Sequence, residues 1–291
     1  MSWIHILILA FVQGMTELLP VSSSAHVIVI AELLHENMST PANALLLVML
    51  HTGTMFAVIV YFWRRWVREF LSSWSKFYRF AKLIFVACLL SGVVFLPIRS
   101  LVVHILSHGN YHASIETLFH KLNWIAPALF IVGLVILYAG LREARKPASD
   151  KVSVPKGISW RDSIVMGILQ GFAIPFRGFS RSGSTISGGL LTGGNRDEIE
   201  SFSFAMGVAI TPLAIGWLLL RDLRAIHRAG LTIHLGTILA PGLFGMACAF
   251  VAGLLALLWL SRWLEHGRWY WFGIYCLVAS VTVEILYLHG W

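Results

Sequence analysis

Charged residues are scarce in this chain. Asp, Glu, Lys and Arg together make up 12% of its 291 residues, about half of their share in a typical soluble domain. Hydrophobic residues make up 57%, and the mean hydropathy is +0.76. A globular core cannot enclose that much apolar surface, so much of it must face lipid. The composition excludes a water-soluble globular protein and predicts an integral membrane protein.

Cysteine is also rare, and this excludes two further classes. The three cysteines occur singly in apolar stretches, so neither a disulfide framework nor a cysteine zinc site is indicated. The 22 basic residues outnumber the 14 acidic ones, but they form short clusters between apolar segments and no single stripe. That is the pattern of membrane loops, so no nucleic-acid partner is expected. The N-terminus lacks a basic segment and is not expected to be a cleaved signal peptide.

Six apolar stretches are long enough to cross a bilayer as helices of about twenty residues. They are expected at residues 43–63, 80–98, 122–141, 201–220, 236–261 and 268–290. Two more, at about 2–34 and 160–193, are interrupted midway by Gly, Pro and Ser. Because neither half of these is long enough to span, each is expected to form a re-entrant helical hairpin. The predicted fold class is an all-α polytopic membrane protein.

The two interrupted stretches resemble each other. One reads QGMTELLPVSSSAHVIV from Gln13, and the other reads QGFAIPFRGFSRSGSTISG from Gln170. Each precedes three predicted spans, and an odd number of spans turns the second copy upside down. The sequence therefore predicts an inverted repeat, with residues 1–141 and 160–291 joined by a linker at 142–159. Irregular backbone at membrane depth must line an enclosed cavity, which predicts one central site.

The loop charges predict the orientation. One set of loops holds fifteen Lys and Arg residues, and the opposite set holds five. The richer set, which includes Arg65, Arg145 and Arg268, is expected on the cytoplasmic side. Both termini and the first hairpin then open to the outer side, and the second hairpin enters from the cytoplasm.

The first hairpin carries an acidic residue among apolar ones. Glu17 follows Gln13 by four positions, so the two share a helix face. A carboxylate at membrane depth is costly and usually functional. The alternative is a locally paired acid near a helix end.

A cluster of hydroxyls follows in the same hairpin. Ser22, Ser23, Ser24 and His26 come directly after Pro20. Hydroxyls at a helix start can bind a phosphate together with the free backbone N–H groups. One of them could be a nucleophile with Glu17 or His26 as its base. The alternative is an ordinary serine helix cap.

The second hairpin offers a phosphate ligand. Arg181 lies among Ser180, Ser182, Gly183 and Thr185. Arginine binds phosphate in a bidentate manner, glycine permits close approach, and hydroxyls add donors. The alternative is an arginine that ties helix ends together. Whether the mid-span His51 lines the site or only bonds a neighbouring helix stays open.

These motifs resemble those of a known family. QGMTELLPVSSSAH resembles the (E/Q)xxxE and PVSSxxH motif of the bacterial undecaprenyl-pyrophosphate phosphatases, and RGFSRSGSTISGG resembles their PGxSRSxxT motif. HTGTMFAVIVYFWRR is similar to their third element. The resemblance covers nearly the whole chain. Three positions depart from the family: Arg177 replaces a proline, Cys276 replaces a frequent arginine, and His51 stands where glutamine is common.

The resemblance implies an enzyme that removes one phosphate from undecaprenyl pyrophosphate and recycles the carrier lipid of cell-wall synthesis in the bacterial inner membrane. It implies that Ser23 is the nucleophile or a direct phosphate ligand. His26 would assist proton transfer, and Arg181 would clamp the phosphate. Gln13 and Glu17 would hold a divalent cation, Mg²⁺ or Ca²⁺. The resemblance leaves open whether the chain forms a homodimer.

Two other functions suit an inverted repeat with a midplane site. One is a flippase or transporter of polyprenyl phosphates. The other is a protein that sequesters the pyrophosphate lipid without turnover. The cluster of Ser, Glu and His favours the enzyme, because transport alone requires no nucleophile.

Overall fold

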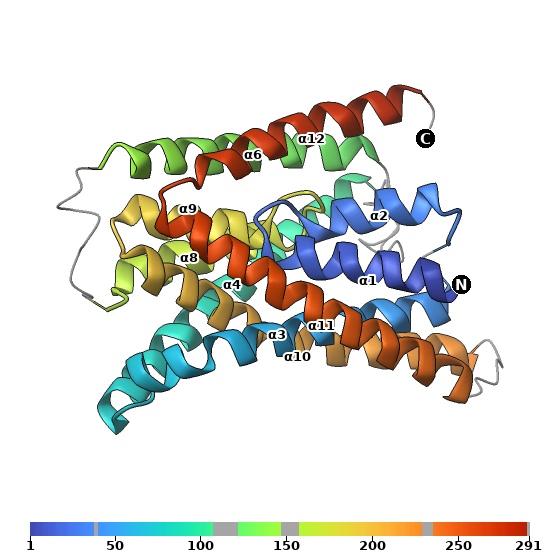
Figure 1. The fold of residues 1–291 in the computed structure, drawn as a ribbon, viewed down its shortest axis with the longest axis horizontal. Coiled ribbons are helices and arrows are strands. Elements are labelled where there is room, and N and C mark those ends of the chain that lie inside the picture. The colour runs from blue at the N-terminus through green and yellow to red at the C-terminus, as the bar shows by residue number, and fades with distance from the viewer. Residues whose placement is uncertain (38–39, 107–121, 147–156, 229–234, 290–291) are drawn as a thin grey trace. The chain divides into compact units, whose positions relative to one another are not determined.

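The computed structural model describes residues 1–37, 40–106, 122–146, 157–228 and 235–289. Within these ranges it has ten helices and no strand (Figure 1). In chain order these are α1 (Trp3–Leu18), α2 (Ser23–Leu33), α3 (Pro41–Glu69), α4 (Trp74–Leu106), α6 (Leu122–Ala144), α8 (Trp160–Ala173), α9 (Arg181–Thr192), α10 (Arg196–Arg228), α11 (Leu235–Glu265) and α12 (Tyr270–Leu288). Of the predicted linker 142–159, residues 147–156 lie outside the described ranges.

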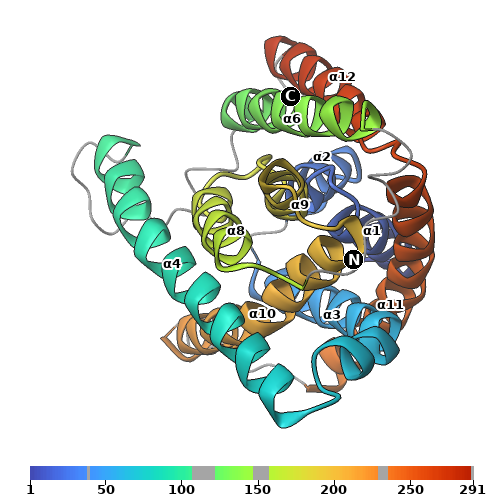
Figure 2. The same ribbon diagram turned by 90° about the vertical axis from the view of Figure 1, so that its left-hand side faces the viewer.

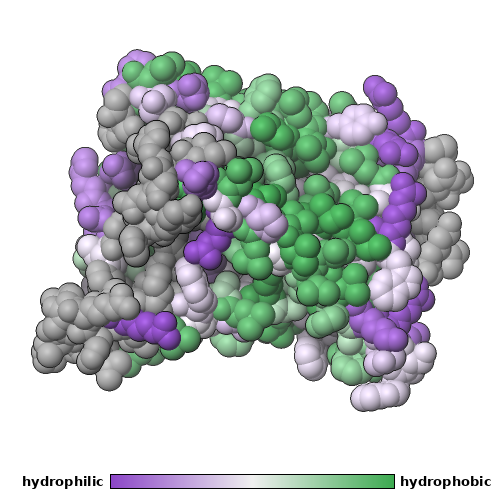
Figure 3. All heavy atoms as spheres, turned by 180° about the vertical axis from the view of Figure 1, so that it is seen from behind, coloured by the Kyte–Doolittle hydropathy of each residue, from purple (hydrophilic) through white to green (hydrophobic). Residues whose placement is uncertain are grey.

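Six helices are long and apolar enough to cross a membrane. Their apolar segments are Asn43–Glu69, Trp74–His104, Trp124–Ala144, Arg196–Trp217, Leu239–Leu264 and Tyr270–Leu288. Each predicted span coincides with one of these, so the all-α class and the six long helices are confirmed. Many large apolar side chains are exposed, and Figure 3 shows apolar residues gathered on one face. Such a surface suits lipid rather than water.

The other four helices form two short pairs. Helices α1 and α2 have 16 and 11 residues, and α8 and α9 have 14 and 12, all below the twenty or so that a span requires. Within each pair the helices lie side by side (Figures 1 and 2). The predicted helix–turn–helix arrangement is therefore present. That each pair enters a membrane only partway stays a prediction.

Local sequence explains where these short helices begin and end. Helix α8 starts with a capping box, in which Ser159 and Asp162 each accept a hydrogen bond from the other's backbone N–H. Ser180 caps α9, and Gly193 ends it with a left-handed φ of 95°. Pro20 follows closely on α1, and proline cannot continue a helix.

The chain groups into two compact units. Unit 1 comprises Met1–Leu19, Ser23–Arg64 and Gly207–Leu260, and unit 2 comprises Pro20–Ser22, Arg65–Met206 and Ser261–Trp291. The inverted repeat of 1–141 and 160–291 stays a prediction.

Small residues allow close helix packing in unit 1. A Cβ added to Gly14 of α1 would lie 2.5 Å from the Ala252 Cβ, and one added to Gly53 of α3 would lie 2.3 Å from the Met246 carbonyl oxygen. Both partners belong to α11. Helices α1 and α3 therefore contact α11 backbone to backbone, as membrane helices with small residues commonly do.

Unit 2 combines close packing with buried hydrogen bonds. Helices α6 and α12 pack tightly, and a Cβ on Gly140 would lie 2.3 Å from the Tyr270 backbone nitrogen. Helix α8 packs on α4, where Ser163 Oγ donates to the Leu83 carbonyl over 2.7 Å. The buried Ser91 Oγ also donates to the Gly167 carbonyl over 2.9 Å. These bonds satisfy hydroxyls that would otherwise be buried without a partner.

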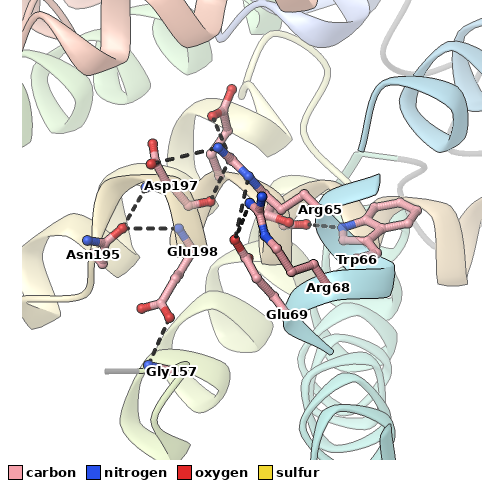
Figure 4. Close-up of polar contacts among 10 residues, drawn as sticks. Arg65, Trp66, Arg68, Glu69, Gly157, Asn195, Asp197 and Glu198 are labelled. Carbon is pink, nitrogen blue, oxygen red and sulfur yellow. Dashed lines mark hydrogen bonds and ion pairs between the residues drawn. The ribbon is translucent and has the colours of Figure 1, made fainter. Parts of the chain in front are cut away.

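A charged network surrounds the start of α10 (Figure 4). Arg65 at the end of α3 lies 3.7 Å from Asp197 Oδ2 and 3.8 Å from Glu69 Oε1. The neighbouring Trp66 donates its indole N–H to the Ser201 carbonyl over 3.3 Å. Glu198 Oε1 accepts the Gly157 N–H over 2.9 Å. The network fixes the end of α3 to the start of α10 within unit 2, and its charged side chains pair with one another.

Candidate active site

The centre of the candidate site in unit 1 is the carboxylate of Glu17. Gln13 lies one turn earlier on α1, is almost fully buried, and donates its amide N–H to Glu17 Oε2 over 3.1 Å. The predicted shared face of the two side chains is therefore confirmed. The hydrogen bond fixes the direction of the carboxylate, which would be costly to hold in an apolar environment without such partners.

Ser23 is the first residue of α2 and contacts the same carboxylate oxygen. Its hydroxyl donates to Glu17 Oε2 over 2.5 Å. A serine hydroxyl bonded to a carboxylate is the arrangement of a nucleophile with its proton acceptor. The preceding Ser22 has a left-handed φ of 68°, which is uncommon for a residue with a side chain and is often found at functional sites.

His51 of α3 lies near the Glu17 carboxylate. Its Nε2 lies 3.7 Å from Glu17 Oε2. Its Nδ1 lies 2.8 Å from the Leu47 carbonyl, which can only accept, so Nδ1 carries the hydrogen. The ring is thereby oriented with Nε2 toward the carboxylate. The question that the sequence left open is answered: His51 lies at the Glu17 site.

The other residues predicted for this hairpin occupy the start of α2. Ser24 and His26 lie in its first turn and are half-buried, and Ser22 is buried just before it. His26 is one turn beyond Ser23 on the same helix. Their roles in binding and proton transfer stay predictions.

The residues predicted in the second hairpin lie at the start of α9 in unit 2. Ser180 accepts the Gly183 N–H over 3.1 Å as the helix cap, and Arg181 is the first helical residue. Thr185 Oγ1 lies 2.9 Å from the Arg181 carbonyl and 2.6 Å from Ser203 Oγ. The hydroxyls of Ser180 and Thr185 thus stabilise the helix start and its packing.

Two further residues of that hairpin show how tightly it is packed. Ser182 is buried, and a Cβ added to Gly183 would lie 2.6 Å from Ile136 Cδ1. The start of α9 has the sequence of an anion site, because a helix N-terminus and an arginine as its first residue occur together there. Phosphate binding by Arg181, Ser182 and Gly183 stays a prediction.

The donors around Glu17 decide what kind of cation they could hold. In the described ranges no group of three His, Cys, Asp or Glu side chains could hold a metal ion. Glu17 and Gln13 offer one carboxylate and one amide oxygen. Magnesium is commonly bound by one or two carboxylates together with substrate phosphates. The donor set therefore fits a cation shared with a phosphate and does not fit a cation held by protein alone.

Comparison with known proteins places the chain in a family. The family model described as bacitracin resistance protein BacA matches residues 6–282. The chain belongs to the BacA family. It is 46% identical over 288 residues to undecaprenyl-diphosphatase 2 of Acinetobacter baylyi, with 98% of each chain covered. It is 32% identical over 289 residues to the undecaprenyl-diphosphatase of Rhodopirellula baltica, again with 98% of each covered.

A third relative supports the same assignment. The undecaprenyl-diphosphatase of Mycobacterium leprae is 33% identical over 291 residues, which cover 98% of this chain and 95% of that protein. Membership of the BacA family confirms the resemblance drawn from the two motifs. Together with six apolar helices, it makes this chain a multi-pass membrane protein.

One departure from the family motifs has a structural explanation. Cys276 of α12 is fully buried, and its thiol lies 3.3 Å from the Pro20 carbonyl, within unit 2. A long charged side chain would not fit this position without rearrangement. The cysteine of this BacA member therefore holds the turn before α2 by a short, uncharged contact.

Proposed function

We infer that this chain is an undecaprenyl-diphosphatase. It hydrolyses undecaprenyl pyrophosphate to undecaprenyl phosphate and inorganic phosphate, which returns the carrier lipid to cell-wall synthesis. Family membership over residues 6–282 supports the activity. The observation that carries the chemistry is the 2.5 Å hydrogen bond from Ser23 to Glu17, which joins a nucleophile to a base.

The geometry suggests how the residues act. Glu17 Oε2 takes the proton as Ser23 Oγ forms a bond to the terminal phosphorus. The phosphoanhydride P–O bond breaks, and undecaprenyl phosphate leaves with the electron pair. Water then attacks the phosphoserine, inorganic phosphate is released, and Ser23 regains a proton.

The remaining residues of the site bind and orient. Gln13 donates to Oε2 of the Glu17 carboxylate, and His51 Nε2 faces the same oxygen. Gln13 and Glu17 would hold a divalent cation, which neutralises phosphate charge when it is bound. Arg181 and the start of α9 are proposed as phosphate ligands on the strength of their residue types. His26 is proposed as a proton carrier.

The location of the enzyme follows from the same proposal. Undecaprenyl pyrophosphate is a membrane lipid of bacteria, so the enzyme is proposed to lie in the inner membrane. The charge bias of the loops supports a cytoplasmic position for the basic end and a site that opens to the periplasm.

Phosphate release from a C55 polyprenyl pyrophosphate by the purified protein in detergent tests the function. Ser23→Ala should abolish release, whereas Ser75→Ala, which removes an exposed hydroxyl of α4, should not. Acid quenching with substrate labelled in the terminal phosphate should trap label on the wild type and none on Ser23→Ala. If the folded wild-type protein moves the lipid across vesicle membranes but releases no phosphate, the protein is a transporter and not a phosphatase.

A further inference from the structure

The second hairpin reverses direction in a tight turn at residues 176–179, between α8 and α9. The Phe179 N–H donates to the Phe176 carbonyl over 3.1 Å and closes the turn. Gly178 has a left-handed φ of 96°, whereas Arg177 before it has a negative φ. This combination defines a type II turn, in which proline is common at the second position and glycine is favoured at the third.

The contacts around this turn hold it without the Arg177 side chain. Phe172 of α8 packs against both ends of the turn, with its ring centroid 5.1 Å from that of Phe176 and 5.2 Å from that of Phe179. A Cβ added to Gly178 would lie 2.6 Å from the Ile125 carbonyl oxygen, so the turn lies directly on the α6 backbone. The proline of the family motif would suit this backbone at least as well as arginine. The fold therefore does not explain the arginine.

The charge of Arg177 has no protein partner in the described ranges. The side chain is half-buried, and it forms no hydrogen bond or ion pair with the residues described there. Its own hairpin cannot neutralise it, because residues 163–195 contain no Asp or Glu and only one other charged residue, Arg181. A partly buried charge without a partner is costly, and a charged residue among apolar ones is usually functional. An anionic ligand from outside the chain would offset this cost.

Arg177 and Arg181 belong to one short segment that leads into α9. Arg181 is the first residue of that helix and follows the Ser180 cap. The segment 177–181 thus carries two arginines at a helix N-terminus, where the helix dipole also favours an anion. Guanidinium groups bind phosphate oxygens in a bidentate manner, so two arginines match a ligand with two phosphates. A monophosphate needs only one of them.

We propose that Arg177 is a second phosphate ligand, which makes the protein select a polyprenyl pyrophosphate over the corresponding monophosphate. Arg177 pairs with one phosphate and Arg181 with the other. Hydrolysis leaves a single phosphate on the lipid, so one of the two contacts is lost and the lipid product is bound more weakly. The proposal rests on the proposed function, because it takes the pyrophosphate lipid as the ligand, but it concerns binding and not bond cleavage.

Native mass spectrometry of the full-length protein in detergent tests the proposal, because it identifies each bound lipid by its mass. Undecaprenyl pyrophosphate and undecaprenyl phosphate are the probes, and Ser23→Ala is the parent protein so that neither lipid is consumed. Adding Arg177→Gln should weaken pyrophosphate binding by about tenfold or more, as the loss of a hydrogen bond to a charged group does. Binding of undecaprenyl phosphate should change by less than about threefold.

Two control variants separate the charge of Arg177 from the turn and from general electrostatics. Arg177→Pro keeps the type II turn, so the melting temperature should not fall, but pyrophosphate binding should be as weak as in Arg177→Gln. Arg161→Gln removes an exposed charge from the start of the same hairpin and should change pyrophosphate binding by less than about twofold. Tight pyrophosphate binding by Arg177→Pro would overturn the proposal, and so would equal weakening by Arg161→Gln and Arg177→Gln.

Two further outcomes identify the source of the phosphate and the link to catalysis. If Arg177→Gln weakens binding of phosphatidylglycerol and not of undecaprenyl pyrophosphate, the arginine contacts ordinary lipid headgroups and the proposal is wrong. If Arg177→Gln loses the selectivity although the wild-type protein releases no phosphate, the proposed hydrolysis fails and the Arg177 assignment stands. If phosphate release is confirmed and Arg177→Gln keeps the selectivity, only the Arg177 assignment fails.

Discussion

The Ser23 hydroxyl and the Glu17 carboxylate are joined by a hydrogen bond of 2.5 Å, although the two residues are six positions apart and on either side of a helix break. The same oxygen, Oε2, accepts from Gln13 over 3.1 Å, and His51 Nε2 lies 3.7 Å away. Three helices thus converge on one carboxylate oxygen within unit 1. An acid held in this way in an apolar chain is better explained by chemistry than by stability, because it is costly to bury.

Glu17→Gln should separate the two explanations. The amide keeps the size of the side chain but accepts the Ser23 proton poorly, so kcat/KM should fall by about 10²–10⁴. Because the variant removes a charge from an apolar site, the melting temperature should stay equal or rise. Phosphate release and thermal unfolding in detergent measure both quantities. Glu32→Gln on the exposed side of α2 is the control and should change neither.

The coupling between the two residues gives a sharper measurement. If Glu17 acts through Ser23, the double variant Glu17→Gln/Ser23→Ala should be no slower than Ser23→Ala alone. The rate losses of residues that act as a unit do not multiply. If the loss of rate in the double variant equals the product of the two single losses, the residues act independently, which would contradict the proposed pair.

His51 is expected to position Glu17 rather than to contact the substrate. His51→Ala removes the ring that faces the carboxylate, and kcat should fall by about tenfold while KM changes by less than about twofold. His51→Gln keeps a polar side chain of similar reach beside the carboxylate and should recover much of the loss. Steady-state kinetics on the three proteins provide the measurement. A change confined to KM would mean that His51 binds the substrate directly.

The proposed cation should depend on the substrate phosphates. EDTA should stop phosphate release, and Mg²⁺ or Ca²⁺ should restore it. Because Gln13 and Glu17 supply few donors, calorimetry should detect only weak cation binding to the lipid-free protein and tighter binding with a non-hydrolysable pyrophosphate analogue. Full activity in EDTA would remove the cation from the mechanism. Tight binding without any phosphate would mean that further protein ligands exist.

Much of the fold could be predicted because apolar length is a direct signal. Six stretches of about twenty residues had no alternative to spanning helices. The ends were less predictable: α3 was expected to stop near residue 63 but continues to Glu69. Contacts of Arg65 and Trp66 with the start of α10 hold that extension. Such contacts depend on residues more than a hundred positions away, which no local pattern contains.

The candidate site was predictable to a similar degree. Helical spacing placed Gln13 and Glu17 on one face, and a helix break followed by serines pointed to Ser23. The sequence could not decide whether His51 lies at the Glu17 site, because that depends on how α3 packs against the first hairpin in unit 1. It also could not show that the Ser180 and Thr185 hydroxyls bond within the protein, since Ser203 lies on another helix.

Helix packing in unit 2 should be sensitive to single methyl groups. A Cβ on Gly140 would lie 2.3 Å from the Tyr270 backbone nitrogen, and backbone cannot move aside as a side chain can. Gly140→Ala should therefore destabilise the protein by about 1–3 kcal/mol, seen as a lower melting temperature in detergent. Gly92→Ala is the matched control, because a Cβ there would meet nothing within 4 Å. It should be neutral or stabilising by about 0.5–1 kcal/mol, since alanine favours a helix over glycine. Equal melting temperatures for the two variants would show that α6 and α12 do not pack as closely as this contact requires.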